Sequence, residues 1–174
     1  MSEATSLAPA IVNGEFAIAG GLIVIGGTLI VDALRRCADR KSLSQAIVGE
    51  ISALVEIVRR RHYIEDLTAL IEKLKAENNR ASVGWFRFSA RGNYFAVYQA
   101  NLARLGMLRN PQPGLVVQYY TQTASILEDI RDMDEGKPAA LSWDEAIRRL
   151  EDLCDLFKDT DNLGRRLSGL PPRS

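Results

Sequence analysis

Histidine and cysteine are scarce in this chain of 174 residues, which narrows the chemistry available to it. There is one histidine, His62, and the two cysteines, Cys37 and Cys154, lie far apart and form no CxxC motif. A zinc site needs several such side chains at close spacing, and a disulfide-stapled domain needs more cysteines. The sequence therefore predicts no metal and no disulfide framework, and it fits a reducing compartment.

Catalytic and nucleotide-binding motifs are also missing. There is no Ser-His-Asp set, HExxH, P-loop or G-x-S-x-G element, and the stretch GGLIVIGG lacks the G-x-G-x-x-G spacing of a dinucleotide site. Apolar residues make up 47% of the chain and charged residues 25%, a balance typical of a folded protein. Because the net charge is zero, nucleic acid is not an expected partner. We predict a folded, non-catalytic protein without a cofactor.

Charge itself is absent from residues 16–31, sixteen consecutive positions that are mostly Ile, Leu, Val, Ala and Gly. As a helix this stretch would be about 24 Å long, a turn short of the roughly 30 Å hydrocarbon core, and Leu34 extends it. It is apolar on all sides, and its paired glycines suit a membrane helix better than a soluble one. We predict a transmembrane helix over 15–34. The alternative is a buried core helix of a soluble domain.

The flanks of this stretch differ in charge. Arg35, Arg36, Arg40 and Lys41 follow it, whereas no basic residue precedes it. The positive-inside rule then makes the C-terminal part cytoplasmic and residues 1–14 a short extracytoplasmic tail. Small side chains along one side of the helix permit close helix–helix approach in lipid. The predicted packing face consists of Ala17, Gly20, Gly21, Gly27 and Thr28.

The chain after the apolar stretch has a helical pattern. Ser42–Gln45 has the form of a capping box, and apolar residues then recur at helical spacing over 47–58 and 64–74. The helical spacing of the apolar residues shifts by one residue near 61–63. Because no Gly or Pro interrupts the pattern, we favour a single long helix that changes its buried face over two helices that meet at a bend.

Capping signals predict three further helices. The first runs over about 93–105 and is ended by Gly106. The second begins with Asn110 as its N-cap and Pro111 as its first helical residue. Ser142-Trp-Asp-Glu145 is a second capping box and opens the last helix.

No segment has the pattern of a strand. The predicted fold is therefore all-α, with an N-terminal transmembrane helix followed by a helical bundle of about four amphipathic helices. The bundle is expected over 42–163 as a cytoplasmic domain, and 164–174 as a flexible tail.

Aromatic and basic residues alternate within 81–110, and no Asp or Glu occurs from Asn78 to Leu127. Three interpretations stay open: the aromatics pack in the core, the segment contacts lipid headgroups or a protein partner, or, least favoured, it stacks on single-stranded nucleic acid. The candidate contact residues are Trp85, Phe86, Arg87, Phe88 and Arg91.

Polar residues among apolar ones suggest a second candidate site. Tyr98, Asn101 and Tyr119 can form either a buried network that fixes helix register or the lining of a small pocket. Asp159 and Asp161 are interpreted as solvating a helix end.

Three segments carry a family resemblance: EISALVEIVRRRHYIEDL, VYQANLARLGML and VVQYYTQTASILEDI, which follow the glycine-rich apolar stretch. Together they resemble a family of small uncharacterised bacterial single-pass membrane proteins with a cytoplasmic helical domain. The resemblance covers about residues 15–133 and rests on Tyr98, Asn101, Leu105, Gly106 and the pair Tyr119 and Tyr120. It implies a bacterial inner-membrane location and no catalytic residues, because that family has no assigned activity.

These observations favour a membrane-anchored helical interaction or regulatory module that is non-catalytic, binds a protein partner and self-associates. The alternative is a soluble helical domain that binds a ligand or acts as an enzyme, with 16–31 as a core helix and a pocket at Tyr98, Asn101 and Tyr119.

Overall fold

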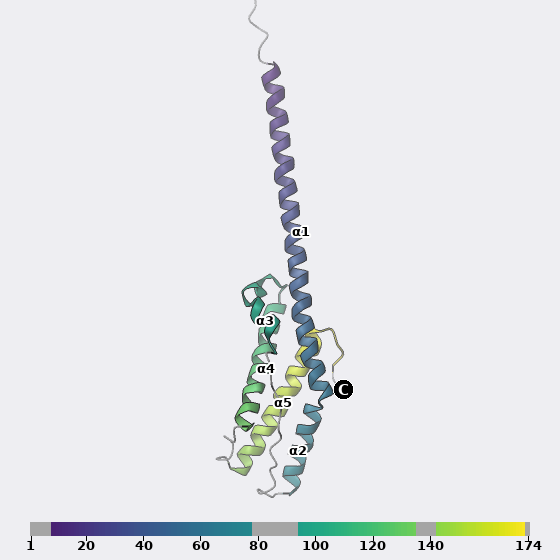
Figure 1. Cartoon of the computed structure of the whole chain (residues 1–174), viewed down its shortest axis with the longest axis vertical. Helices are drawn as coiled ribbons and strands as arrows, with labels where there is room; N and C mark the ends of the chain where they lie inside the picture. Colours follow the sequence, from purple (N-terminus) through teal and green to yellow (C-terminus); the bar gives the residue numbers. More distant parts are fainter. Residues whose placement is uncertain (1–7, 78–93, 135–141, 173–174) are drawn as a thin grey trace, which may run out of the picture. The chain divides into compact units, whose positions relative to one another are not determined.

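The computed structural model describes residues 8–77, 94–134 and 142–172, with side chains in the first range from residue 28 onward. Within these ranges every regular element is a helix, so the predicted all-α fold is confirmed (Figure 1). The elements in chain order are α1 (Ala8–Arg60), α2 (Tyr63–Glu77), α3 (Ala96–Asn101), the 3₁₀ helix η2 (Leu102–Met107), α4 (Gln112–Asp134) and α5 (Trp143–Leu167).

The chain divides into two units, Met1–Ser42 and Leu43–Ser174, which we call the N-terminal unit and the bundle unit. In the N-terminal unit the described part of α1 exposes large apolar side chains, including Leu29 at 62% and Leu34 at 65%. Of the helices with described side chains, none is both long and apolar enough to cross a membrane. The predicted span over 15–34 lies mostly outside those residues, as do Ala17, Gly20, Gly21 and Gly27.

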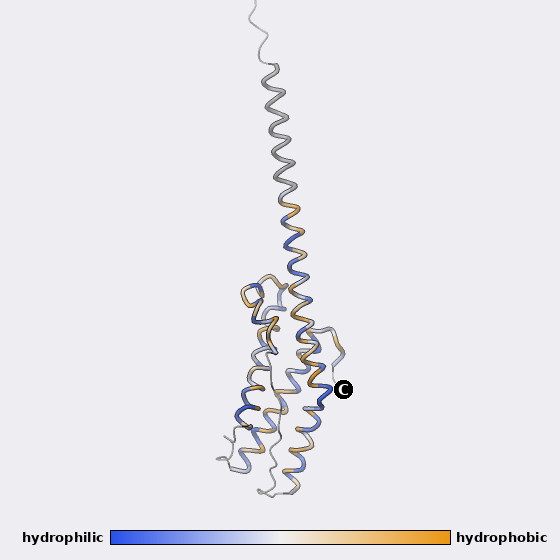
Figure 2. The backbone as a smooth tube through the Cα atoms, in the orientation of Figure 1, coloured by the Kyte–Doolittle hydropathy of each residue, from blue (hydrophilic) through white to orange (hydrophobic). Residues whose placement is uncertain are grey.

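The bundle unit buries two clusters of apolar side chains, and apolar and polar residues alternate along its helices (Figure 2). The first cluster joins the last part of α1 to η2, α4 and α5. It contains Leu43, Ile47, Ile51, Leu54, Val55, Leu105, Leu108, Val116, Tyr119, Tyr120 and Leu163. The second joins α2, α4 and α5. It contains Ile64, Leu67, Ile71, Ile126, Ile130, Leu153, Cys154 and Phe157.

Helices α2 and α5 run antiparallel. The ring of Tyr63 at the start of α2 lies 6.2 Å from that of Phe157, and Lys75 near its end forms a 2.7 Å ion pair with Glu151 near the start of α5. Since α4 supplies Tyr120 to the first cluster and Ile130 to the second, it runs parallel to α1 and α2.

The single long helix favoured by the sequence is wrong. Helix α1 ends at Arg60, and α2 begins at Tyr63 after His62, whose φ of 52° lies in the left-handed region. Histidine tolerates this conformation better than most residues, and it lets α2 restart with its apolar side turned toward the core. The slip in the apolar rhythm was the signal of this bend.

The capping signals had mixed outcomes. Ser142 is confirmed as a cap, because its Oγ accepts from the Glu145 amide while the Glu145 carboxylate accepts from the Ser142 amide. The box at Ser42 is wrong, because this residue lies inside α1 and an N-cap must be non-helical. The predicted start with Asn110 as cap and Pro111 as first helical residue is one residue too early, because α4 begins at Gln112.

Two further boundaries differ from expectation. The helix expected to end at Gly106 is instead the short α3 followed by η2, and Gly106 lies inside η2. Helix α5 continues to Leu167, past the expected start of the flexible tail at Gly164. Gly164 is buried, and a Cβ on it would lie 2.6 Å from both Tyr119 Cε2 and Val55 Cγ2. Its missing side chain therefore allows α5 to approach α1 and α4.

We predict that Gly164→Ala lowers the free energy of unfolding by about 1–3 kcal/mol, because the added methyl group overpacks this contact. Gly49→Ala is the matched control, since nothing lies within 4 Å of its Cβ position on α1 and alanine favours a helix. Denaturant unfolding followed by far-UV circular dichroism compares the two. Equal stability of both variants would contradict the close approach at Gly164.

Candidate functional site

The carboxylate of Glu50 links three parts of the bundle unit. It lies on the side of α1 that carries Ile47, Ile51 and Leu54, all of which are buried. Glu50 Oε1 accepts a 2.8 Å hydrogen bond from the Val97 amide, and Oε2 accepts 3.0 Å from the Tyr98 amide and 2.5 Å from the Tyr120 hydroxyl. One side chain of α1 thus contacts both α3 and α4.

Helix α3 depends on this contact. The first amides of a helix have no partner within it, and Phe95, the residue before α3, provides no side-chain cap. None of the residues of α3 is fully buried, so apolar burial holds it less firmly than the longer helices. Glu50 supplies from α1 the acceptors that a local cap would supply.

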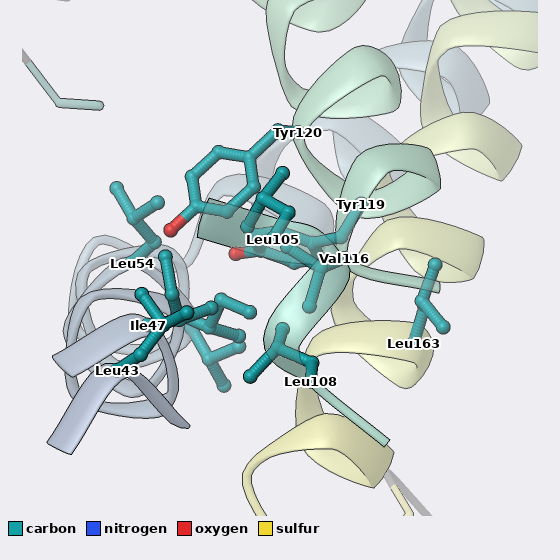
Figure 3. Packing of buried hydrophobic residues seen from close by; sticks show 11 residues of the cluster. Leu43, Ile47, Leu54, Leu105, Leu108, Val116, Tyr119, Tyr120 and Leu163 are labelled. Atoms are coloured by element: carbon teal, nitrogen blue, oxygen red, sulfur yellow. The ribbon is translucent and has the colours of Figure 1, made fainter. Parts of the chain in front are cut away.

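Aromatic rings surround Tyr120 and fix the direction of its hydroxyl. Tyr98 stacks on it at 3.9 Å between ring centroids and an interplanar angle of 13°, while Phe95 and Tyr119 meet it edge-on at 5.5 and 5.4 Å. Figure 3 shows Tyr120 extending from α4 toward the α1 residues, with its oxygen at the end nearest them. The cluster therefore presents a polar group to Glu50 inside an otherwise apolar contact.

The predicted polar residues lie near this cluster but differ in their contacts. Tyr98 and Tyr119 both contact Tyr120, whereas the Asn101 side chain donates to the Val97 carbonyl of its own helix at 2.8 Å. Trp85, Phe86, Arg87, Phe88 and Arg91 lie outside the described residues.

Sequence reasoning missed Glu50, although a signal existed. Residues 47, 50, 51 and 54 share one face of a helix, so an acid at 50 interrupts an apolar stripe. Such a carboxylate needs hydrogen-bond donors, but its donors lie 47 to 70 positions further along the chain, where no local pattern points to them.

A pocket of about 70 Å³ lies between the two apolar clusters. Leu54, Val55 and Tyr119 of the first cluster and Ile126, Ile130 and Phe157 of the second contribute to its walls. Ile57, Val58 and Tyr63, on either side of the bend at His62, also line it. The bend thus lies at the level of the pocket, where α1 gives way to α2.

One part of the pocket wall is polar and includes Thr123, Thr160 and Asp161. The interpretation of Asp161 as solvating a helix end is wrong, because its side chain is only 1% exposed and forms a 2.7 Å ion pair with Arg165 Nε. Asp159, two residues earlier, is exposed, but it too lies within α5 and not at its end. The continuation of α5 to Leu167 places Asp161 inside the bundle unit.

The arrangement suits binding of a neutral molecule better than holding a metal. Within the described ranges no three His, Cys, Asp or Glu side chains gather as metal ligands do. Comparison of the chain with protein-family models, curated proteins and solved structures gives no match. The function proposed below therefore rests on the sequence and the geometry.

We predict that Glu50→Gln lowers the free energy of unfolding by about 1.5–3 kcal/mol, because hydrogen bonds to a partly buried charge are lost and an amide donor then faces other donors. Urea unfolding followed by circular dichroism measures the change.

Glu56→Gln on the same helix is the control. Its carboxylate is exposed, and hydrogen bonds from Arg59 and Arg60 lower its pKa to about 2. We expect little change in stability there, since exposed ion pairs contribute little. Equal losses in the two variants would argue against a special role for Glu50.

Alkaline pH provides another test. Burial raises the pKa of Tyr119 above its ordinary value near 10, and burial together with the hydrogen bond to Glu50 raises that of Tyr120. Because the folded state holds these protons more tightly than the unfolded state, their contribution to stability is present below pH 10 and is lost as the pH rises above it. We expect two of the five tyrosines to form phenolate only as the helices unfold. Near-UV absorbance measures phenolate formation. Ionisation of all five with the helices intact would refute this.

Proposed function

We propose that this protein is a membrane-anchored helical module that is non-catalytic and acts by binding a protein partner. Residues 15–34 form its transmembrane helix, residues 1–14 lie outside, and the bundle unit lies on the cytoplasmic side of a bacterial inner membrane. The observation that carries the proposal is the continuity of α1, which runs from Ala8 to Arg60. It contains both the uncharged stretch 16–31 and five residues of the first apolar cluster, from Leu43 to Val55.

Exposed apolar side chains support the anchor. Leu29, Ile30, Val31 and Leu34 are 62, 63, 46 and 65% exposed in the described part of the N-terminal unit. Leaving large apolar groups in water costs about 25 cal/mol per Å², so such a run favours a lipid or protein environment.

Exposed basic side chains follow at once, with Arg35, Arg36 and Lys41 along the same helix. Cations at the end of an apolar stretch contact anionic headgroups on the cytoplasmic side.

The interaction role rests on two sets of residues. The small-residue face over 17–28, of which Thr28 is described and exposed, suits self-association within the membrane. The aromatic and basic residues of 85–91 suit a second contact, with headgroups or with the partner. The alternative, a soluble ligand-binding domain in which 16–31 is a buried helix, predicts that the protein is released from membranes without detergent.

We predict that the full chain stays in the membrane pellet after an alkaline wash. Such a wash disrupts electrostatic contacts with the membrane surface but does not remove a helix that spans the bilayer. Release into the soluble fraction would refute the anchor and favour the soluble alternative.

The cysteines report the orientation in the same preparation. Cys37 is exposed just after the apolar stretch, and Cys154 is buried. A membrane-impermeant maleimide should label Cys37 in inverted vesicles and not in intact spheroplasts. Cys37→Ser, which leaves only Cys154, is the control and should remain unlabelled until the protein is denatured. Labelling of Cys37 in spheroplasts would reverse the orientation.

A further inference from the structure

The pocket between the two clusters has mainly apolar walls and one polar part, which constrains what it can hold. Leu54, Val58, Ile126 and Phe157 line it with carbon atoms. Such walls exclude a strongly hydrated ion and favour an aliphatic body.

The polar part of the wall offers acceptors. The Thr123 hydroxyl donates to the Tyr119 carbonyl at 2.8 Å, and the Thr160 hydroxyl lies 3.5 Å from Gln122 Oε1, to which it donates. Because both hydroxyl hydrogen atoms are already donated, only the lone pairs of the hydroxyl oxygens are left to interact with a bound molecule. A bound molecule must therefore bring a donor. It need not bring a positive charge, because Arg165 already balances Asp161.

The volume limits the size of the guest. A cavity of about 150 Å³ holds benzene, and one water needs roughly 10–15 Å³ on a comparable scale. The 70 Å³ pocket is about half the benzene-sized cavity and about five times the space of one water, which suits a guest of about three to five non-hydrogen atoms.

We propose that this pocket binds a small neutral molecule that is mainly aliphatic and carries one hydroxyl group, which donates to the Thr123 and Thr160 side of the wall. This goes beyond the membrane-anchored role and does not depend on it, because every residue involved belongs to the bundle unit.

The route of entry follows from Tyr94, which lines the pocket and precedes α3. Glu50 holds this segment through the amides of Val97 and Tyr98, about one helical turn from Tyr94. We infer that the guest enters and leaves beside this segment.

The test uses isobutanol as the probe and full-length protein in deuterated detergent. Saturation-transfer difference NMR reports contact between the alcohol and the protein. Thr123→Leu fills the pocket, and Thr121→Leu makes the same change at an exposed position on the same helix. We expect a signal from the wild type and from Thr121→Leu that is lost in Thr123→Leu. Equal signals from all three would overturn the site, since they would report partition into the micelle.

Two further variants test the parts of the proposal and guard against misfolding of Thr123→Leu. Thr160→Val keeps the shape of the side chain and removes its hydroxyl, and we expect it to weaken isobutanol binding about fivefold. Unchanged binding would overturn the role of the hydroxyl group.

Glu50→Gln should raise the dissociation rate constant of isobutanol about fivefold by loosening the segment at Tyr94. An unchanged rate constant would overturn the entry route. Circular dichroism confirms that each variant is folded before binding is measured.

Discussion

The fold of the bundle unit depends on one carboxylate that accepts three hydrogen bonds across it. Glu50 sits on an apolar side of α1, where an unsatisfied charge would be costly. The amides of Val97 and Tyr98 and the hydroxyl of Tyr120 satisfy it together. Because α3 is short and has no fully buried residue, this carboxylate and the stacking of Tyr98 on Tyr120 tie it to the longer helices.

The same contact connects the core to the pocket. Tyr120 is held by Tyr98, Phe95 and Tyr119, and Tyr119 in turn lines the pocket with Tyr94. Glu50, Tyr120 and Tyr119 are therefore in consecutive contact, and the last of them reaches the pocket wall. Gly164 also lies close to Tyr119 and Val55, two residues of the pocket wall.

The bend at His62 separates the long helix α1 from α2, and the two helices pack in different apolar clusters. Before it, α1 carries the apolar stretch, the basic flank and five residues of the first cluster, and after it α2 pairs with α5 in the second cluster. The pocket lies where the clusters meet, so the break in helical register coincides with a gap in the packing. An anchored module with a ligand pocket would combine a fixed location with a response to a small molecule.

The sequence by itself determined the all-α class, the cap at Ser142 and most of the apolar positions that became the core, because these follow from local periodicity and local hydrogen bonds. It also carried the slip in rhythm that marks the bend, although Gly and Pro were absent. Tertiary structure alone decided the partners of Glu50, the burial of Asp161 and the need for glycine at 164. Each of these depends on side chains or amides far away in the chain, and helical spacing contains no information about them.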